Sequence, residues 1–98
     1  MAVIVNLQLN VKKGREEEFP QFIAGVLPDT RAFEGCNWVY FTTNSSDPTS
    51  FEFFSSWDSK EDQLKYMQWR QENGSMEVFA SWLEGEPVFR YLDVEQSY

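Results

Sequence analysis

A chain of 98 residues is sufficient for one domain, and we expect a single domain over residues 1–98. A chain of this size buries only about 60 to 65 per cent of its unfolded surface, so its hydrophobic core is modest. The 16 acidic and 8 basic side chains give a formal net charge of −8, which repels nucleic-acid phosphates and anionic membrane surfaces. Composition therefore argues against a nucleic acid or a membrane as partner.

The chain contains no histidine and no glycine-rich phosphate loop. Without imidazole it cannot use histidine-based nucleophile triads or histidine metal sites. Its acidic residues come in runs such as residues 16–18, which are typical of solvated surface and not of converging metal ligands. The sequence therefore predicts neither a metal site nor a bound cofactor.

Cys36 is the one cysteine, so the chain cannot form an internal disulfide. It begins an apolar run, and no basic residue adjoins it to lower its pKa, which indicates a buried thiol in a reducing compartment. The N-terminus lacks the residue order of a secretory signal, and no apolar run reaches the roughly 20 residues that span a bilayer. We therefore expect a cytoplasmic protein.

Alternating apolar residues predict a first strand over residues 3–11. The odd-numbered positions are all apolar, whereas Asn6 and Gln8 share the other face with Ile4. An amide on a covered sheet face either is satisfied within a polar network or points into a cavity, and the sequence leaves both possibilities open.

A first helix is predicted over residues 15–27, with the acidic residues 16–18 in its first turn and apolar residues at helical spacing after them. Pro20 suits a first turn. Pro28 is expected to kink or end the helix, which leaves residues 29–33 as a looser continuation.

Aromatic and β-branched residues predict two further strands, over residues 36–43 and 51–57. The seven residues between them predict a loop that joins an antiparallel hairpin. Asp58 is predicted to be the N-cap of a second helix, with Glu61 completing a capping box.

The second helix is predicted to end at about residue 73, where Asn73 and Gly74 supply a left-handed cap. Residues 75–84 predict a short third helix, and residues 88–94 a last strand before a frayed tail at 95–98. The order of these elements is typical of the α+β class, as a ferredoxin-like βαββαβ sandwich with a short extra helix before the last strand. Helices would cover one face of the sheet. The aromatic residues of the later strands indicate that a second subunit covers the other face, so we expect a homodimer.

Arg70 falls inside the apolar stripe of the second helix, one turn after Tyr66. Its guanidinium either pairs with a carboxylate such as Glu52 or Asp93, or acts as a clamp for an anion or a carbonyl. Trp69 falls on the solvated face of this helix and is expected to dock on the third helix or on a partner subunit.

Three segments carry a family resemblance: Thr30-Arg31 with Gly35-Cys36, then FEFFSSWDSKEDQLKYMQWR at residues 51–70, then PVFRYLDV at residues 87–94. In this order they resemble the antibiotic biosynthesis monooxygenase-like family of dimeric α/β-barrel proteins, over nearly the whole chain. The resemblance implies a ferredoxin-like protomer whose sheet packs on that of a second subunit, with a pocket between the sheet and the helices.

The same resemblance implies site residues. Asn6 and Trp57 match positions where family members place pocket groups, and Tyr66 stands where many relatives carry histidine, nine residues after the tryptophan. Because that histidine binds the iron in haem-degrading members, its replacement disfavours haem degradation. The predicted residues are, as catalytic groups, Asn6, Trp57 and Tyr66, and, as substrate-binding groups, Arg70, Tyr40 and Phe53.

The resemblance thus implies a cofactor-independent monooxygenase that acts on a small aromatic, phenolic or quinol-type compound. Such a substrate supplies the electrons to O₂, while the protein contributes orientation and charge stabilisation. The alternative is a non-catalytic dimeric protein of the same fold that binds a small molecule or another protein, which the missing histidine favours. An RNA-recognition domain of similar topology is disfavoured by the net charge.

Overall fold

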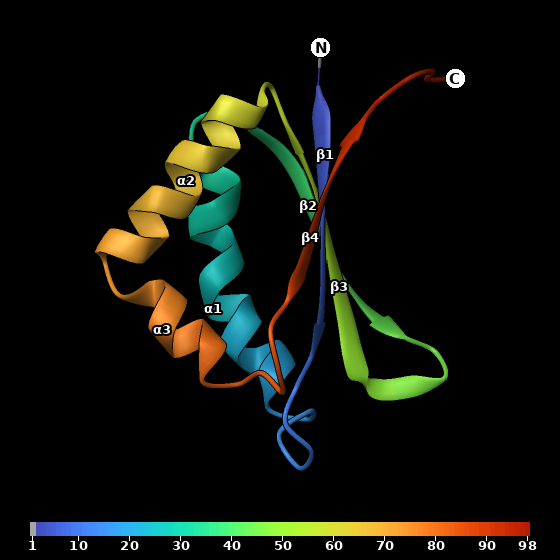
Figure 1. Cartoon of the computed structure of the whole chain (residues 1–98), viewed down its shortest axis with the longest axis vertical. Helices are drawn as coiled ribbons and strands as arrows, with labels where there is room; N and C mark the ends of the chain where they lie inside the picture. Colours follow the sequence, from blue (N-terminus) through green and yellow to red (C-terminus); the bar gives the residue numbers. More distant parts are fainter. Residues whose placement is uncertain (1) are drawn as a thin grey trace.

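The computed structural model describes residues 2–98 as a four-stranded sheet with three helices on one of its faces (Figure 1). In chain order the elements are β1 (Val3–Asn10), α1 (Phe19–Ala32), β2 (Cys36–Asn44), β3 (Asp47–Trp57), α2 (Lys60–Glu72), α3 (Ser75–Ala80) and β4 (Val88–Asp93). The strand order is β2-β3-β1-β4, and each neighbouring pair is antiparallel. The predicted α+β class and ferredoxin-like order are confirmed, and the sheet remains open within one protomer.

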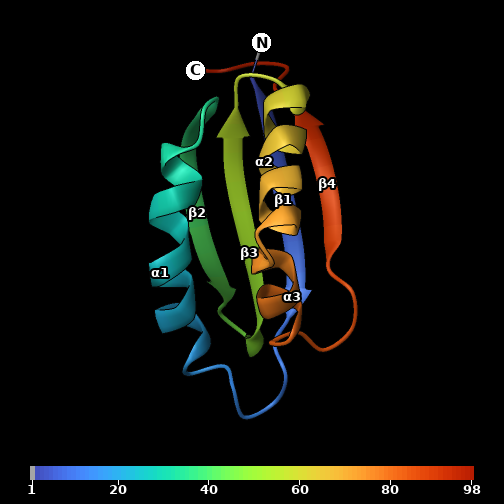
Figure 2. The same ribbon diagram turned by 90° about the vertical axis from the view of Figure 1, so that its left-hand side faces the viewer.

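The two sheet faces differ in what covers them. Figure 2 shows α1 in front of β2 and α2 in front of β1, while β4 lies at the edge beyond the helices. Side chains alternate across each strand, so the apolar odd-numbered residues of β1 face the helices and its even-numbered residues face the other way. We call the second face the open face; none of the three helices within residues 2–98 covers it (Figure 1).

The core between the helices and the sheet is built mainly from aromatic rings. Phe19 of α1 is buried at its centre, with five other aromatic ring centroids 5.2–6.2 Å from its own. A second cluster surrounds Trp57 at the end of β3, where Val3, Val5 and Cys36 are also buried. The burial of Cys36 confirms its interpretation as a core residue.

Helix α1 differs from its prediction at both ends. It begins at Phe19, so the acidic residues 16–18 precede it, and Pro20 takes the first turn as predicted. The prediction that the helix ends at Pro28 is wrong, because the α-helix continues to Ala32. Proline deprives the carbonyl of Ala24, four residues earlier, of its helical partner, but Ala24 and Pro28 are both exposed, so water can satisfy that carbonyl.

Helix α2 begins one residue later than predicted. Its N-cap is Ser59 and not Asp58: Ser59 Oγ accepts a hydrogen bond from Asp62 N at 3.2 Å and donates one to Asp62 Oδ2 at 3.1 Å. Asp62 thus takes the place of the predicted Glu61, although its carboxylate accepts from the Ser59 hydroxyl and not from the Ser59 backbone N–H of a capping box. Gly74, in the left-handed conformation with φ 80°, separates α2 from α3 as expected.

Two connections are tighter than the sequence predicts. Strand β3 begins at Asp47, opposite Asn44, so the predicted seven-residue loop is only a two-residue turn at 45–46. Helix α3 ends at Ala80 instead of residue 84, because Leu83 forms a bridge with Val11 beside the end of β1. Strand β4 ends one residue before its predicted limit. No helix within residues 2–98 is long and apolar enough to cross a membrane.

Candidate functional site

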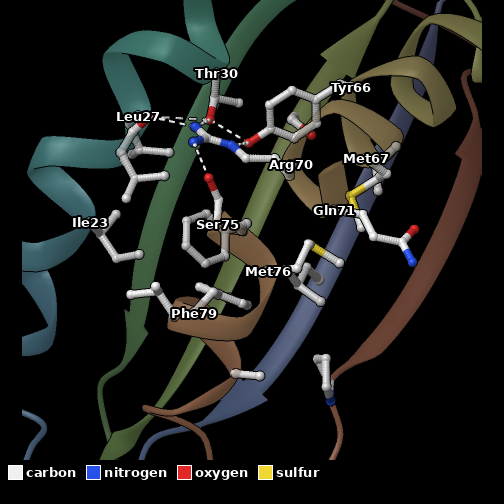
Figure 3. Close-up of a pocket in the computed structure, with 18 of the residues that line it drawn as sticks. Ile23, Leu27, Thr30, Tyr66, Met67, Arg70, Gln71, Ser75, Met76 and Phe79 are labelled. Carbon is white, nitrogen blue, oxygen red and sulfur yellow. Dashed lines mark hydrogen bonds between the residues drawn. The ribbon is translucent and has the colours of Figure 1, made fainter. Parts of the chain in front are cut away.

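A cavity of about 790 Å³ lies between the sheet and the three helices. Its wall is mostly apolar, with side chains from α1, α2, α3, β1 and β3, and Figure 3 shows how those of the helices surround it. The volume falls within the range of roughly 300 to 1,000 Å³ that is usual for small-molecule sites. The apolar wall therefore suits the hydrophobic body of a small organic ligand.

Tyr66 and Arg70 of α2 meet Thr30 of α1 at one end of this cavity (Figure 3). The Nε of Arg70 donates to the phenol oxygen of Tyr66 at 2.9 Å, and that oxygen lies 2.6 Å from Thr30 Oγ1. Since the phenol oxygen accepts from Arg70, its own proton is free to be donated to Thr30. We call these three residues the polar end of the cavity.

Arg70 is buried, with only 7% of the residue exposed. Its Nη2 donates to the carbonyl of Val26 at 3.0 Å and to Thr30 Oγ1 at 3.2 Å, and its Nη1 donates to Ser75 Oγ at 3.4 Å. Each hydrogen bond that the structure shows for this group ends on a neutral oxygen. The buried positive charge is therefore solvated by hydroxyl and carbonyl dipoles.

The predicted pairing of Arg70 with Glu52 or Asp93 is wrong. Glu52 projects from the open face, on the other side of the sheet, where it accepts a hydrogen bond from Asn6. Asp93 lies exposed at the end of β4. Arg70 is held instead by neutral groups of α1, α2 and α3.

Trp57 forms part of the cavity wall and is 1% exposed. Its ring centroid lies 5.2 Å from that of Tyr66 and 6.4 Å from that of Phe33, and its Nε1 donates to Ser55 Oγ at 2.9 Å. The indole N–H is thus already satisfied. Trp57 holds the Tyr66 ring in place from the sheet side.

Within its own protomer, Trp69 packs on Phe33 at the end of α1 and not on the predicted third helix; docking on a partner subunit stays a prediction. Its side chain is 37% exposed, and its ring centroid lies 5.5 Å from that of Phe33, beyond the end of α1. The Cζ atom of Arg70 lies 4.7 Å from the Trp69 ring, within the range of a cation–π contact. Trp69 therefore lies between the guanidinium and the solvent.

The structure brings four of the six predicted site residues to the cavity and leaves two away from it. Those on its wall are Phe53, Trp57, Tyr66 and Arg70. Asn6 and Tyr40 lie instead on the open face, because the strand register places both on the same side of the sheet as Phe54 and Arg90. The structure therefore does not bring Asn6 together with Trp57 and Tyr66.

Asn6 is buried within a polar network and does not point into a cavity. Its Nδ2 donates to Glu52 Oε1 at 3.1 Å and to the Phe53 carbonyl at 3.2 Å, and its Oδ1 accepts from Arg90 Nε at 3.0 Å. Tyr40, further along the same face, is 62% exposed and lies beside Trp38 with ring centroids 4.9 Å apart. Of the two possibilities for the strand amides, the polar network is the correct one for Asn6.

Several polar residues on the cavity wall were not predicted as site residues, among them Thr30, Gln63 and Ser75. Thr30 follows Ile23, Val26 and Leu27 at helical spacing, so a hydroxyl in that apolar stripe was a signal available in the sequence. Ser75 and Gln63 carried no comparable signal. Ser75 meets Arg70 through the turn after α2.

Gln63 is buried and accepts a hydrogen bond at 2.8 Å from the hydroxyl of Tyr91 on β4. Desolvation raises the pKa of Tyr91 above its usual value, so this phenol stays protonated and keeps donating. The pair links α2 to the edge strand beside the cavity. It therefore closes the β4 side of the site.

Burial also raises the pKa of the Cys36 thiol, although the nearby Arg31 guanidinium opposes the shift. Arg31 donates to the Cys36 carbonyl at 2.9 Å and so faces the backbone. The thiol is therefore a weak nucleophile. No cluster of three or more His, Cys, Asp or Glu side chains that could hold a metal ion is present in the part of the chain that the structure describes.

The family model named antibiotic biosynthesis monooxygenase matches residues 2–84, which include every helix and the first three strands. The chain belongs to this family. The resemblance seen in the sequence is thereby confirmed. No curated protein matches the chain in sequence.

Solved structures share the fold at low identity. A Nitrosomonas europaea protein of unknown function, NE2512, superposes with a TM-score of 0.83 at 18% identity, over 99% of this chain and 92% of that one. SnoaB, a cofactor-independent oxygenase from Streptomyces nogalater, gives a TM-score of 0.83 at 10% identity, over 98% and 95%. A candidate antibiotic biosynthesis monooxygenase from Deinococcus radiodurans gives 0.84 at 14%, over 98% and 95%. At these identities the likeness shows the fold alone.

Proposed function

We propose that this chain is a cofactor-independent monooxygenase that oxidises a small aromatic, phenolic or quinol-type compound. The observation that carries the proposal is the polar end of the cavity, where the Tyr66 hydroxyl and the Arg70 guanidinium terminate an apolar space of about 790 Å³. Family membership supports oxidation as the reaction class. The name of the similar SnoaB structure supports chemistry without a cofactor.

The proposed reaction balances without an external reductant. A phenol whose para ring C–H becomes a carbonyl gives up four electrons and takes one atom of O₂, while the other oxygen atom leaves as water with the two hydrogens lost from the substrate. Both electron pairs come from the substrate. The task left to the protein is to hold the ring, exclude water and stabilise the phenolate from which electrons leave.

Each cavity residue has a distinct role in this proposal. Arg70 stabilises negative charge as the substrate hydroxyl ionises, and the Tyr66 hydroxyl, which accepts from Arg70 Nε at 2.9 Å, orients the guanidinium. Trp57 and Phe53 provide aromatic wall for the substrate ring. Asn6 and Tyr40 are not assigned to this site, since they lie on the open face.

We propose further that the open face pairs with that of a second copy of the chain. Tyr40, Val88 and Leu92 expose large apolar surface there, and such a surface favours a protein partner. The network around Asn6 lies within the same face, so its polar groups are already satisfied before pairing. An interface of this kind leaves the cavity, on the other side of the sheet, accessible.

Oxygen uptake by the purified protein with a panel of phenols and hydroquinones tests the proposed activity. We expect turnover above the buffer rate, and a loss of about 10-fold or more in Tyr66→Phe, because this variant loses the hydroxyl that orients the Arg70 guanidinium. Tyr98→Phe, in the exposed C-terminal tail, is the matched control and should retain full activity.

The alternative function, a dimeric binding protein without chemistry, has a different result in the same experiment. Calorimetric binding of an aromatic compound with no oxygen uptake across the panel would support that alternative and contradict the monooxygenase. If turnover is unchanged in Tyr66→Phe, the reaction does not take place at the polar end of the cavity.

A further inference from the structure

Arg70 is a buried cation whose hydrogen bonds go to neutral groups. Burying a charge costs free energy, and a carboxylate partner is the usual compensation. Here the guanidinium is held by Tyr66, Thr30, Ser75 and the carbonyl of Val26. The site therefore holds a full positive charge without a bonded anion.

The guanidinium also has donor capacity left on the atom nearest Ser75. Its single Nε–H is used by Tyr66, and Nη2 makes two hydrogen bonds with its two hydrogens. Nη1 has two hydrogens but makes one hydrogen bond, to Ser75 Oγ, and at 3.4 Å it is the longest of the four. One N–H of Nη1 is therefore available, and the other is weakly engaged.

The residues around this end of the cavity provide an apolar setting for an anion. Figure 3 shows Ile23, Leu27, Met76 and Phe79 on the same side of Arg70 as Ser75. Glu77 is the one acidic residue on the cavity wall; its side chain is exposed, and it forms no hydrogen bond with Arg70 in the structure. In an apolar setting a charge-assisted hydrogen bond is stronger than in water.

We propose that the cavity binds an aromatic carboxylate, with its carboxylate held by the available N–H of Arg70 Nη1 and its ring among the apolar residues of α1 and α3. The ligand supplies the negative charge that the protein does not. This inference rests on the proposed function, because it names the class of compound that the same cavity takes. A substrate would then be a phenol or quinol that also carries a carboxylate, which takes the available N–H of Nη1, while Arg70 stabilises the ionising hydroxyl through its charge and not through a second hydrogen bond.

The test compares two ligands of the same shape, naphthoate and naphthamide, by isothermal titration calorimetry with the intact protein. We expect naphthoate to bind at least about 10-fold more tightly, the factor that one charge-assisted hydrogen bond supplies. The preference should fall to about 1-fold in Arg70→Met. Lys65→Met removes an exposed positive charge from the same helix and should leave the preference unchanged.

Circular dichroism would reveal whether Arg70→Met folds. If it does not, the difference in affinity between naphthoate and naphthamide for the unmodified protein still tests the proposal. The side-chain Nε–H NMR resonance of Arg70 is a second measurement, and naphthoate should shift it while naphthamide does not. Equal affinity for the two ligands, a preference that persists in folded Arg70→Met, or an unmoved resonance would each overturn the proposal.

Failure of this inference can be told apart from failure of the proposed function. A carboxylate preference without oxygen uptake would support the ligand class and contradict the monooxygenase. Oxygen uptake with phenols that is indifferent to a carboxylate substituent, together with equal binding of naphthoate and naphthamide, would do the reverse.

Discussion

The two faces of the sheet differ in the charges that surround a buried polar side chain. On the open face, Asn6 lies between an acid and a base, accepting from Arg90 and donating to Glu52, so the charges of that network balance. On the helix face, Arg70 is surrounded by neutral oxygens. A network whose positive and negative charges cancel needs no further partner and can be buried in an interface. A network with a net positive charge still attracts an anion. The difference supports the proposed division, in which the open face has a structural role and the helix face binds the ligand.

The largest expected effect concerns the tryptophans of the two faces. Trp57→Ala removes a fully buried ring from the helix face and should lower the free energy of unfolding by about 3 to 5 kcal/mol. Trp38→Ala, on the open face, should lower it by less, and by an amount that depends on protein concentration if a second copy covers that face. Urea unfolding at two protein concentrations measures both. Equal, concentration-independent losses would erase the distinction between core and interface.

The network on the open face should give the next largest effect. Asn6→Ala leaves Arg90 and Glu52 without their shared partner, and we expect a loss of about 1 to 3 kcal/mol in unfolding free energy. Gln8→Ala is the control, because its one hydrogen bond to Glu52 is 3.5 Å long. Oxygen uptake by Asn6→Ala, corrected for the folded fraction, should stay at the level of the unmodified protein. A specific loss of turnover would return Asn6 to the active site.

Pairing of the open faces should be broken by a charge at its most exposed aromatic residue. Tyr40→Glu should weaken self-association at least about 10-fold, or roughly 1.4 kcal/mol, because a carboxylate would be buried in the interface. Light scattering after size exclusion should then change from two chains of 11.6 kDa to one. Light scattering that shows a monomer in the unmodified protein would contradict the dimer.

The smallest expected effect is a loss of stability at alkaline pH. The folded pKa of Cys36 is raised, so the folded state binds its proton more tightly than the unfolded state does. Stability is then fully present below the unfolded pKa, close to 9.0, and is lost as pH rises towards the folded pKa. Cys36→Ala should flatten this decline in chemical unfolding measured above pH 9.0, while the decline from Tyr91, which begins near pH 10.0, should remain. An unchanged profile in Cys36→Ala would show that another group titrates.

The sequence was sufficient to predict the element order, because it depends on local periodicity. The apolar pattern of α2 was a poor guide to its buried side, since Gln63 and Arg70 are buried there while Leu64 is 47% exposed. The two-residue alternation in β1, in contrast, reports which side of the strand is buried. The same alternation also separated Asn6 from the apolar face, although the resemblance placed it beside Trp57. Where the local pattern and the resemblance differed, the local pattern gave the correct position.

What the sequence could not provide were contacts between distant residues and choices between near-equivalent ones. Arg90 reaches Asn6 across 84 positions, and no short-range pattern reports such a pair. Asp58 and Ser59 are both good N-caps, so one residue of error is inherent in that choice. Pro28 has an intrinsic preference to end a helix, but burial of Ile23 and Thr30 along α1 outweighs it.

The four hydrogen bonds of Arg70 have an entropic consequence. A free arginine side chain samples many rotamers, and fixing them on binding a ligand costs roughly 0.5 to 1.5 kcal/mol. Here Tyr66, Thr30, Ser75 and the Val26 carbonyl fix the guanidinium before any ligand arrives. The ordering is completed during folding, so an anion that meets Nη1 gains the full electrostatic attraction without having to immobilise the group that binds it.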